Sequence, residues 1–374
     1  MNKKAKILLL AGDGIGPEVC GSLKIIINCL NTHSNISFEI DEDLIGGASY
    51  DEHRKPITDS VLEKAKTSDG IILGAVGGEL YDKLPFELKP ERGLLKIRKE
   101  LDLFANIRPA KVFNSLAEAS SLKKEIVENM DIIVLRELTG GIYFGEPRGI
   151  QNLGNKIRRG INTEVYDSNE IIRLGRVGFE IAKKRKKLIH SVEKANVMES
   201  GLLWRDEINK LGHESYPEIK IINMYADNCA MQLVKNPKQF DVIVTGNLFG
   251  DILSDISAEL TGSLGMLPSA SLGEIIPGKN KRLALYEPVH GSAPDIAGKN
   301  LANPIAMLMS FAMFLNYSLD EVKLSSIIEK SIEQVLEKGY RTKDIMQIGL
   351  KQVSTRDMGE LIEQELRIMV NRND

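Results

Sequence analysis

Residues Phe240–Gly262, with the sequence FDVIVTGNLFGDILSDISAELTG, contain the most informative pattern in the chain. The run Asp241–Thr245 has the apolar, β-branched composition of a buried strand, and helical spacing follows from Phe249. Asp251 and Asp255 are four residues apart, so on a helix they project from one face, one turn apart. Mg²⁺ binds one or two carboxylates and would offset the repulsion between them. The alternative is an acid that the helix dipole favours, followed by a solvated acid.

The composition is that of an ordinary globular protein. The 374 residues are long enough for two or three domains, and 43% are hydrophobic. A net charge of −3 gives no general attraction to nucleic acid or to an anionic membrane. The three cysteines, Cys20, Cys29 and Cys229, are too few and too scattered for a disulfide framework. We expect buried, reduced thiols in a cytoplasmic protein.

Neither apolar segment of note predicts targeting or membrane insertion. The run Ile7–Ala11 is too short for the core of a signal peptide. The run Pro304–Tyr317 is shorter than the ~20 residues of a membrane helix. It predicts a buried, Met-rich helix.

Short apolar runs alternate with amphipathic stretches along the chain. This alternation predicts an α/β fold in which helices cover a substantial sheet. No Pro/Gly/Ser-rich linker divides the chain, so a second domain is expected to be inserted and not appended. The expected strands are 5–10, 70–75, 132–135, 188–192, 219–222 and 242–245, and helices are expected at 19–30, 60–67, 168–187 and 202–211.

The glycine-rich segment Gly12–Pro17 follows the first expected strand and resembles a dinucleotide-binding fingerprint. The fingerprint needs Gly-x-Gly-x-x-Gly, but Pro17 occupies the third glycine position. Glu39 or Asp41 as a ribose-binding acid adds little to a broken motif. The segment therefore predicts a tight turn with Pro17 at the first helical position.

Arginines and a tyrosine surround the expected strand at 132–135. Arg136 ends this strand beside Thr139–Gly141, a position suited to bidentate capture of a carboxylate or phosphate. Arg98 and Arg108, taken singly, are also typical of surface salt bridges. Gly140–Pro147 is consistent with a tight hairpin or with an arm that reaches another subunit. Tyr143 within this segment is either a packing residue or a proton donor held near a site.

Three charged features have competing interpretations. The basic run Lys183–Lys187 ends an amphipathic helix and lacks interleaved aromatics, which favours a solvated face over nucleic-acid binding. Lys194 follows a strand and is a candidate base or an exposed lysine. Asp227 lies at a strand-to-helix junction, where a helix N-cap is the simple alternative to a functional acid.

A long loop rich in Gly, Pro, Ser and Asp covers Leu285–Asn300. Loops of this length in compact domains are usually functional. Small residues let the backbone approach a flat ligand closely. Asp295 is suited to hold ribose hydroxyls while it repels a 2′-phosphate.

Seven motifs in fixed order resemble the metal-dependent β-decarboxylating dehydrogenase family, which contains isopropylmalate and isocitrate dehydrogenases. The resemblance covers nearly the whole chain. The motifs are GDGIGPE, GLLKIRKELDLFANIRPAKVF, VLRELTGGIYFGEPRG, EKANV, NLFGDILSD, GSLGMLPSASLG and EPVHGSAPDIAGKNLANP.

The resemblance implies a two-domain α/β fold with a non-Rossmann cofactor site and an active site in the interdomain cleft. Residues 1–103 and 262–374 would form the first, cofactor-binding domain. Residues 104–261 would form an inserted second domain with the dimer interface and an arm. The implied assembly is a homodimer in which each active site borrows residues from the partner subunit.

The same resemblance assigns roles to residues. Tyr143 matches the proton donor and Lys194 the general base, the latter supplied by the neighbouring subunit. The implied metal is one Mg²⁺ or Mn²⁺ per site, held by Asp227, Asp251 and Asp255. The implied substrate-binding residues are Arg98, Arg108, Arg136, Asp227, Leu94, Leu95 and Val197. The implied cofactor is NAD, bound by Gly74, Gly77, Gly78, Glu91, Glu287, His290, Gly291, Ser292, Ala293, Asp295, Ile296 and Asn303.

Leu94 and Leu95 look like an apolar wall that favours isopropylmalate over isocitrate, because isocitrate would bury its extra carboxylate against them. Two features depart from the family pattern. Glu193 stands where the family usually has Asp beside the base lysine. Ile276–Leu283 looks like a longer loop.

Other functions remain open at this stage. Homoisocitrate, tartrate, D-malate and isocitrate dehydrogenases share this metal and arginine set. A Mg²⁺-dependent phosphoryl-handling enzyme would use Gly12–Pro17 as a phosphate cradle, but it leaves the 287–303 loop unexplained. A non-catalytic relative is disfavoured because Tyr143, Lys194 and the three acids are all present.

Overall fold

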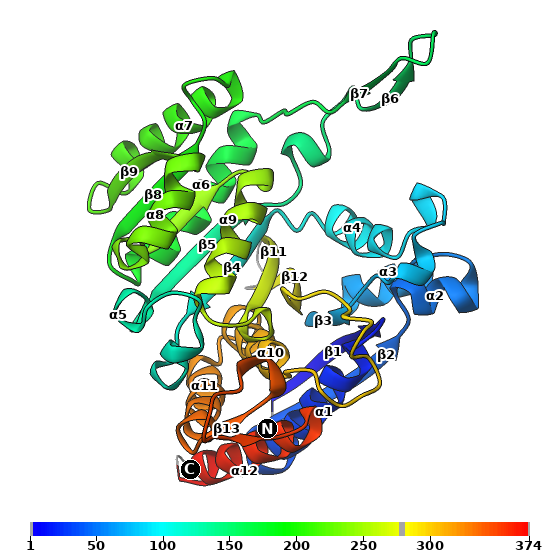
Figure 1. Ribbon diagram of the computed structural model, residues 1–374, viewed down its shortest axis with the longest axis vertical. Coiled ribbons are helices and arrows are strands. Elements are labelled where there is room, and N and C mark those ends of the chain that lie inside the picture. Colours follow the sequence, from blue (N-terminus) through cyan, green and yellow to red (C-terminus); the bar gives the residue numbers. More distant parts are fainter. Residues whose placement is uncertain (1–2, 277–280, 373–374) are drawn as a thin grey trace. The chain divides into compact units, whose positions relative to one another are not determined.

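The computed structural model describes residues 3–276 and 281–372 and divides into two compact units. The first unit comprises Met1–Leu103, Phe113–Ser121 and Thr261–Asp374, and the second comprises Phe104–Val112 and Leu122–Leu260. Both units contain parallel strands and helices, which confirms the α/β fold class. Figure 1 shows the elements of each unit.

The first unit contains five strands in the order β2-β1-β3-β12-β11. Strands β2, β1, β3 and β12 run parallel to one another, and β11 pairs with β12 in antiparallel fashion. Side chains of β1, β3 and β12 share one apolar core cluster with α3 and α4. The bounds are β1 Lys3–Gly12, β2 Ile36–Asp43, β3 Gly70–Ala75, β11 Pro268–Ile276 and β12 Lys281–Pro288.

Helices of the first unit pack on these strands and on one another. Helix α10 contacts β11 and β12, while α1 contacts β2, β3 and α12. Eleven consecutive residues of α10 are buried, which explains its lack of a polar face and confirms the expected buried helix. The bounds are α1 Gly16–His33, α2 Gly46–His53, α3 Asp59–Thr67, α4 Glu91–Glu100, α10 Ile305–Tyr317, α11 Val322–Glu337 and α12 Thr355–Asn371, with a small β13 Tyr340–Arg341 and β14 Lys351–Gln352 pair.

The second unit contains five strands in the order β4-β5-β10-β8-β9. Strand β4 is antiparallel to β5, and the other pairs are parallel. Helix α6 approaches the sheet closely at Gly178, where an added Cβ would lie 2.7 Å from Val244 Cγ2. The bounds are β4 Ala105–Lys111, β5 Asp131–Glu137, β8 Leu188–Glu193, β9 Lys220–Tyr225, β10 Val242–Thr245, α5 Lys124–Val127, α6 Ser168–Lys183, α7 Glu199–Ser215, α8 Ala226–Lys235 and α9 Asn247–Leu260.

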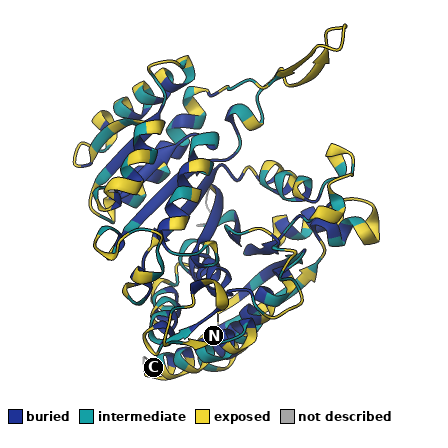
Figure 2. Cartoon of the chain, viewed as in Figure 1, coloured by how far each residue is buried: buried dark blue, intermediate teal, exposed yellow. Residues whose placement is uncertain are grey.

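A two-stranded ribbon extends from the second unit (Figure 1). It consists of β6 Gly149–Asn152 and β7 Arg158–Ile161, and all but one of these residues are exposed (Figure 2). Of the two alternatives for Gly140–Pro147, the tight hairpin is wrong in position, because Gly141–Tyr143 forms a single 3₁₀ turn before the ribbon. The arm that reaches another subunit stays a prediction.

Several local expectations need correction. Pro17 is not the first residue of α1, which begins at Gly16. Helix α6 ends at Lys183, and the basic run beyond it is not wholly solvated, because Arg185 pairs with the buried Asp241. Asp227 is not an N-cap; Tyr225 holds that position.

The longer loop expected at Ile276–Leu283 is also wrong in part. Ile276 ends β11 and Lys281–Leu283 begin β12, so these residues are paired strand and not loop. Residues 277–280 of this expectation, which include Lys279, lie outside the described residues.

The three cysteines are buried and free of disulfides, as expected. Burial raises the pKa of each thiol to about 12. Among residues 3–276 and 281–372, no helix has the length and hydropathy needed to span a bilayer.

The buried His190 on β8 should make stability depend on pH. Burial lowers its pKa from 6.5 to about 4, with Lys220 adding to the effect. Between these values the unfolded chain binds a proton that the folded chain does not, so stability falls as pH decreases through this window. We expect His190→Gln to remove up to about 3 kcal/mol of this loss, measured by urea unfolding at pH 7 and pH 4.5. An unchanged pH dependence in His190→Gln would contradict the prediction.

Candidate active site

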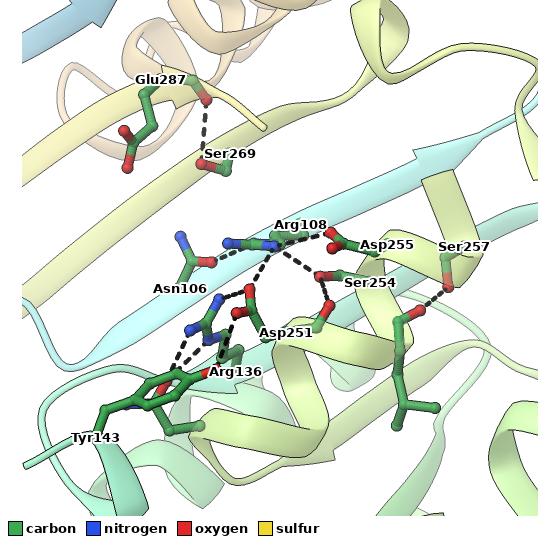
Figure 3. A network of polar contacts seen from close by, with 12 residues as sticks. Asn106, Arg108, Arg136, Tyr143, Asp251, Ser254, Asp255, Ser257, Ser269 and Glu287 are labelled. Atoms are coloured by element: carbon green, nitrogen blue, oxygen red, sulfur yellow. Dashed lines mark hydrogen bonds and ion pairs between the residues drawn. The ribbon is translucent and has the colours of Figure 1, made fainter. Parts of the chain in front are cut away.

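Arg136, at the end of β5, is the centre of a polar cluster in the second unit (Figure 3). Its side chain is buried, with 5% of the residue exposed. Nε and Nη2 donate to Asn247 Oδ1 at 3.0 and 2.8 Å, and Nη1 donates to Asp251 Oδ1. Asn247 and Asp251 belong to the first two turns of α9. The helix therefore fixes the plane of the guanidinium through charge-assisted hydrogen bonds.

Arg108, on β4, lies against the same helix (Figure 3). Nε donates to Asn106 Oδ1 at 2.7 Å, and Nη1 donates to Ser254 Oγ at 2.7 Å and to Asp251 Oδ1 at 3.4 Å. Asp255 Oδ1 is 3.7 Å from Nη1. The two arginines predicted from the second unit thus converge on the predicted acid pair.

Tyr143 reaches Asp251 from the 3₁₀ turn that follows β5. Its hydroxyl donates to Asp251 Oδ2 at 3.2 Å, and the Arg136 guanidinium carbon lies 5.7 Å from its ring centroid. Partial burial and the negative charge of Asp251 raise the pKa of Tyr143. The phenol is therefore protonated at neutral pH and able to donate a proton.

A buried carboxylate shapes the turn that carries Tyr143. Glu137 is fully buried and accepts hydrogen bonds from the backbone and hydroxyl of Thr139, each at 2.8 Å, and from Gly140 N–H at 2.7 Å. Burial raises the pKa of Glu137, while these donors oppose the rise. The strand end is thus held before the chain turns toward Asp251.

Lys194 and Asp227 form a second cluster, built from the ends of β8 and β9. Lys194 Nζ lies 2.8 Å from Asp227 Oδ1 and 5.5 Å from the centroid of the Tyr225 ring. The hydrogen bond from Lys194 lowers the pKa of Asp227. Val197, three residues after the lysine, is 69% exposed. Lys194 is therefore paired, and is not the freely exposed lysine that was the simple alternative.

The acids of the second unit fit a hard divalent cation by chemistry. Asp251 and Asp255 present carboxylate oxygens one helical turn apart, the donors that Mg²⁺ and Mn²⁺ prefer. Partial burial and the charge of Asp251 raise the pKa of Asp255, and a bound cation would reverse this. Within residues 3–276 and 281–372, no three His, Cys, Asp or Glu side chains are grouped to hold a metal. Within one chain, the Asp251–Asp255 pair and Asp227 therefore belong to two separate clusters.

Arg98, in the first unit, projects from α4. Its Nη2 donates to Glu287 Oε1 at 2.6 Å in a partly buried ion pair. Its Nε is buried and has no hydrogen-bond partner in the described part of the chain, so it is available to an acidic ligand. Leu94 and Leu95, one turn earlier on α4, are half-buried.

The glycine-rich turn after β1 connects the two predicted cofactor loops of the first unit. The Asp13 carboxylate is buried and accepts backbone N–H groups of Gly47, Ala48 and Gly77, each at 2.8 Å. Ile15 N–H donates to Ser292 O at 2.8 Å. Gly14 has φ of +57°, and a Cβ there would lie 2.0 Å from Ser292 O, so only glycine fits.

The remaining predicted cofactor residues lie in or beside the loops at Gly74–Gly78 and Glu287–Asn303. Gly74 lies in β3 and Gly78 follows Gly77, while Glu91 begins α4, with Oε1 2.8 Å from a Cβ built on Gly77. Four predicted cofactor residues of the Glu287–Asn303 loop are at least partly exposed. Gly291 and Asp295 are exposed, and Ala293 and Ile296 are half-buried.

Two side chains at the ends of the second loop are fixed. Asn303 accepts from Ile305 N–H at 3.0 Å and donates to Asp344 Oδ2 at 3.0 Å. His290 Nδ1 contacts Gly291 O, and its buried Nε2 has no hydrogen-bond partner among the described residues. Burial lowers the pKa of His290, so its ring is neutral and suited to a polar, uncharged ligand group.

Sequence reasoning missed four residues that organise these sites. Asn247 and Ser254 hold the arginines, and Tyr166 accepts Asn247 N–H at 2.7 Å. Asp13 fixes the predicted cofactor loop at Gly74–Gly78 by accepting the backbone N–H of Gly77. Asn247 and Ser254 stand inside the NLFGDILSD motif, at the helical spacing that places them beside Asp251, so the motif itself contained a signal for them.

The chain is similar to known proteins over nearly its whole length. The family model "Isocitrate/isopropylmalate dehydrogenase" matches residues 6–362. The chain is 57% identical to "3-isopropylmalate dehydrogenase" of Rhodospirillum rubrum, over 98% of this chain and 99% of the relative. It is 58% identical to "3-isopropylmalate dehydrogenase" of Pelagibacter ubique, with the same coverage. The crystal structure of isocitrate dehydrogenase from Methylococcus capsulatus is similar with a TM-score of 0.84 at 30% identity, covering 97% of this chain and 99% of that chain.

The two hydrogen bonds that Arg136 donates to Asn247 yield a prediction for stability. Asn247→Ala removes the acceptor of two charge-assisted hydrogen bonds from Arg136 and should lower the free energy of unfolding by about 2–4 kcal/mol. Urea unfolding followed by the fluorescence of Trp204, the single tryptophan, measures the change. Asn223→Ala removes an exposed Asn–Asn hydrogen bond and should cost less than about 0.5 kcal/mol. Equal costs for the two variants would contradict the role assigned to Asn247.

Proposed function

The chain belongs to the isocitrate/isopropylmalate dehydrogenase family, and from this premise we propose that it is an NAD-dependent 3-isopropylmalate dehydrogenase. It converts (2R,3S)-3-isopropylmalate to 4-methyl-2-oxopentanoate and CO₂ in leucine biosynthesis. The buried arginines around Asp251 suit a dicarboxylic hydroxy acid. The observation that carries the choice of isopropylmalate within that class is the apolar pair Leu94 and Leu95 on α4, the helix that also carries Arg98.

The arginines bind the two substrate carboxylates. Arg108 and Arg136 are pre-organised by Asn106, Ser254 and Asn247, so little side-chain entropy is lost when an anion binds. Arg98 offers its unpartnered Nε from the first unit. Leu94 and Leu95, on the same helix, supply apolar surface for the branched alkyl group, and Val197 contributes more. Contact with three carbons stabilises binding by about 2–3 kcal/mol.

Asp227, Asp251 and Asp255 are the proposed ligands of one Mg²⁺ or Mn²⁺, and the loops at Gly74–Gly78 and Glu287–Asn303 are the proposed NAD site. When bound, the cation stabilises negative charge on substrate oxygens and the nicotinamide accepts a hydride. The carboxylate of Asp295 favours NAD over NADP because it would repel a 2′-phosphate.

Two side chains of the protein move protons. Lys194 Nζ, as the uncharged amine, accepts the proton of the C2 hydroxyl as the substrate is oxidised. Tyr143 donates its phenolic proton to C3 after CO₂ departs. Asp251 orients that phenol by accepting its hydrogen bond, and the raised pKa keeps the proton in place until it is needed.

The proposed enzyme is a homodimer with shared active sites. Lys194 and Asp227 bind each other in a cluster of their own, which suits their joint donation to a neighbouring subunit. Exposed apolar side chains of the second unit provide surface for subunit contact. They include Val197, Leu202, Tyr225, Met231, Val234 and Ile252.

A substrate panel tests the assignment. We expect NADH formation with 3-isopropylmalate and at least about 100-fold lower kcat/KM with isocitrate, homoisocitrate or D-malate. The apolar wall leaves the extra carboxylate of isocitrate and homoisocitrate unpaired, and D-malate has no alkyl group to contact the wall. Replacing NAD by NADP should lower kcat/KM by a similar factor. Excess EDTA should abolish turnover, and added Mg²⁺ or Mn²⁺ should restore it. Turnover of isocitrate with NADP alone would refute the substrate, and turnover after complete chelation would refute the metal.

Mixed dimers test the sharing of sites. Lys194→Ala and Asp251→Asn homodimers should each be inactive, because both of their sites lack one group. A mixture that exchanges subunits should recover about one quarter of wild-type activity, since half of the dimers carry one intact site. Activity of the mixture is measured before and after subunit exchange. Mixtures that stay inactive, although mass spectrometry shows heterodimers, would place both groups in one subunit's site.

A further inference from the structure

Glu193, the last residue of β8, is buried immediately before Lys194. Its Oε1 accepts hydrogen bonds from Arg205 Nη2 at 2.6 Å and Nε at 3.0 Å. Its Oε2 accepts the backbone N–H of Ala195. The carboxylate therefore connects α7, which carries Arg205, to the residues on both sides of Lys194.

The backbone of Lys194 is fixed from several directions. The bond from Glu193 to Ala195 N–H closes a turn across it, and Lys194 O accepts N–H groups of Val197 and Met198 at 3.1 and 3.0 Å. The first turn of α7 packs so closely that a Cβ at Gly201 would lie 2.9 Å from the Lys194 carbonyl carbon. The backbone from which the Lys194 side chain extends is therefore rigid.

A second set of contacts directs the ammonium group. The Arg205 guanidinium carbon and Lys194 Nζ lie 5.2 and 5.5 Å from the centroid of the same Tyr225 ring. Two cations near one ring repel each other unless each has a counter-ion. Glu193 neutralises Arg205, and Asp227 neutralises Lys194.

We propose that Glu193 and Arg205 act together as positioning residues that hold Lys194 Nζ where it accepts the substrate proton; this rests on the proposed function. Removal of the Glu193 charge would leave Arg205 with an uncompensated charge beside Tyr225. Arg205 would then compete with Lys194 for the ring and for Asp227. The Glu193 carboxylate reaches Arg205 and leaves both cations balanced.

The chain contains a matched control. Asp241 is also buried, accepts Arg185 Nε at 2.7 Å and accepts a backbone N–H, that of Lys186, at 2.9 Å. Asp241 immediately precedes β10, whereas Glu193 is the last residue of β8, the strand that runs parallel beside β10. The two clusters are thus chemically alike but lie at opposite ends of neighbouring strands.

The experiment compares Glu193→Gln, Glu193→Asp, Arg205→Lys and Asp241→Asn in the full-length enzyme, below the lowest melting temperature of the set. We expect Glu193→Gln to lower kcat by about 10- to 100-fold, the loss typical of a displaced reactive group, with little change in KM for isopropylmalate or NAD. Glu193→Asp should recover most of the lost kcat because it keeps the charge. Arg205→Lys should be intermediate, since lysine cannot make the two-nitrogen contact. Asp241→Asn should lose stability but keep kcat.

A second measurement does not depend on turnover. Competitive acetylation with acetic anhydride, read by mass spectrometry, should modify Lys194 faster in Glu193→Gln than in wild type, relative to Lys220, and should not change in Asp241→Asn. Wild-type kcat in Glu193→Gln, or an equal loss of kcat in Asp241→Asn, would overturn the positioning role. A wild-type enzyme without isopropylmalate turnover would overturn the proposed function instead, and the acetylation rates would then decide the positioning of Lys194.

Discussion

The convergence of Arg108 and Arg136 on Asp251 is the interaction on which the second unit depends. Burying two guanidinium groups is costly unless each finds anionic or polar acceptors. Here α9 supplies Asn247, Asp251 and Ser254 from one face, while β4 supplies Asn106. The position of α9 beside β4 and β5 therefore satisfies these charges. The groups that stabilise the unit are therefore the groups proposed to bind the substrate.

The sequence predicted the elements whose burial is uniform. Strands β3 and β10 are continuous apolar runs, and their predicted bounds are those of the structure. Strand β4 was missed because Asn106 and Arg108 interrupt its apolar pattern, and β11 because Ser269 and Ser271 do the same. All four of these polar residues are nonetheless buried. The apolar pattern thus missed these two strands because part of what they bury is polar.

The candidate site, too, could be predicted only in part from the sequence. Spacing alone placed Asp251 and Asp255 on one helical face, and the order of motifs identified the arginines, Tyr143 and Lys194 as candidates. Spacing could not show that Glu193 reaches Arg205, that Arg185 reaches Asp241, or that Asp13 holds Gly77, because each contact joins residues far apart in sequence or depends on side-chain length. Such contacts follow from tertiary packing, which no local pattern contains.

The burial of all three cysteines has a practical consequence. A thiol attacks electrophiles as its thiolate, and a pKa of about 12 leaves almost none of that form at neutral pH. Maleimides and iodoacetamides should therefore spare the native protein. A single cysteine introduced on the exposed β6–β7 ribbon would accept a fluorophore or spin label selectively, and the natural cysteines would not need to be replaced.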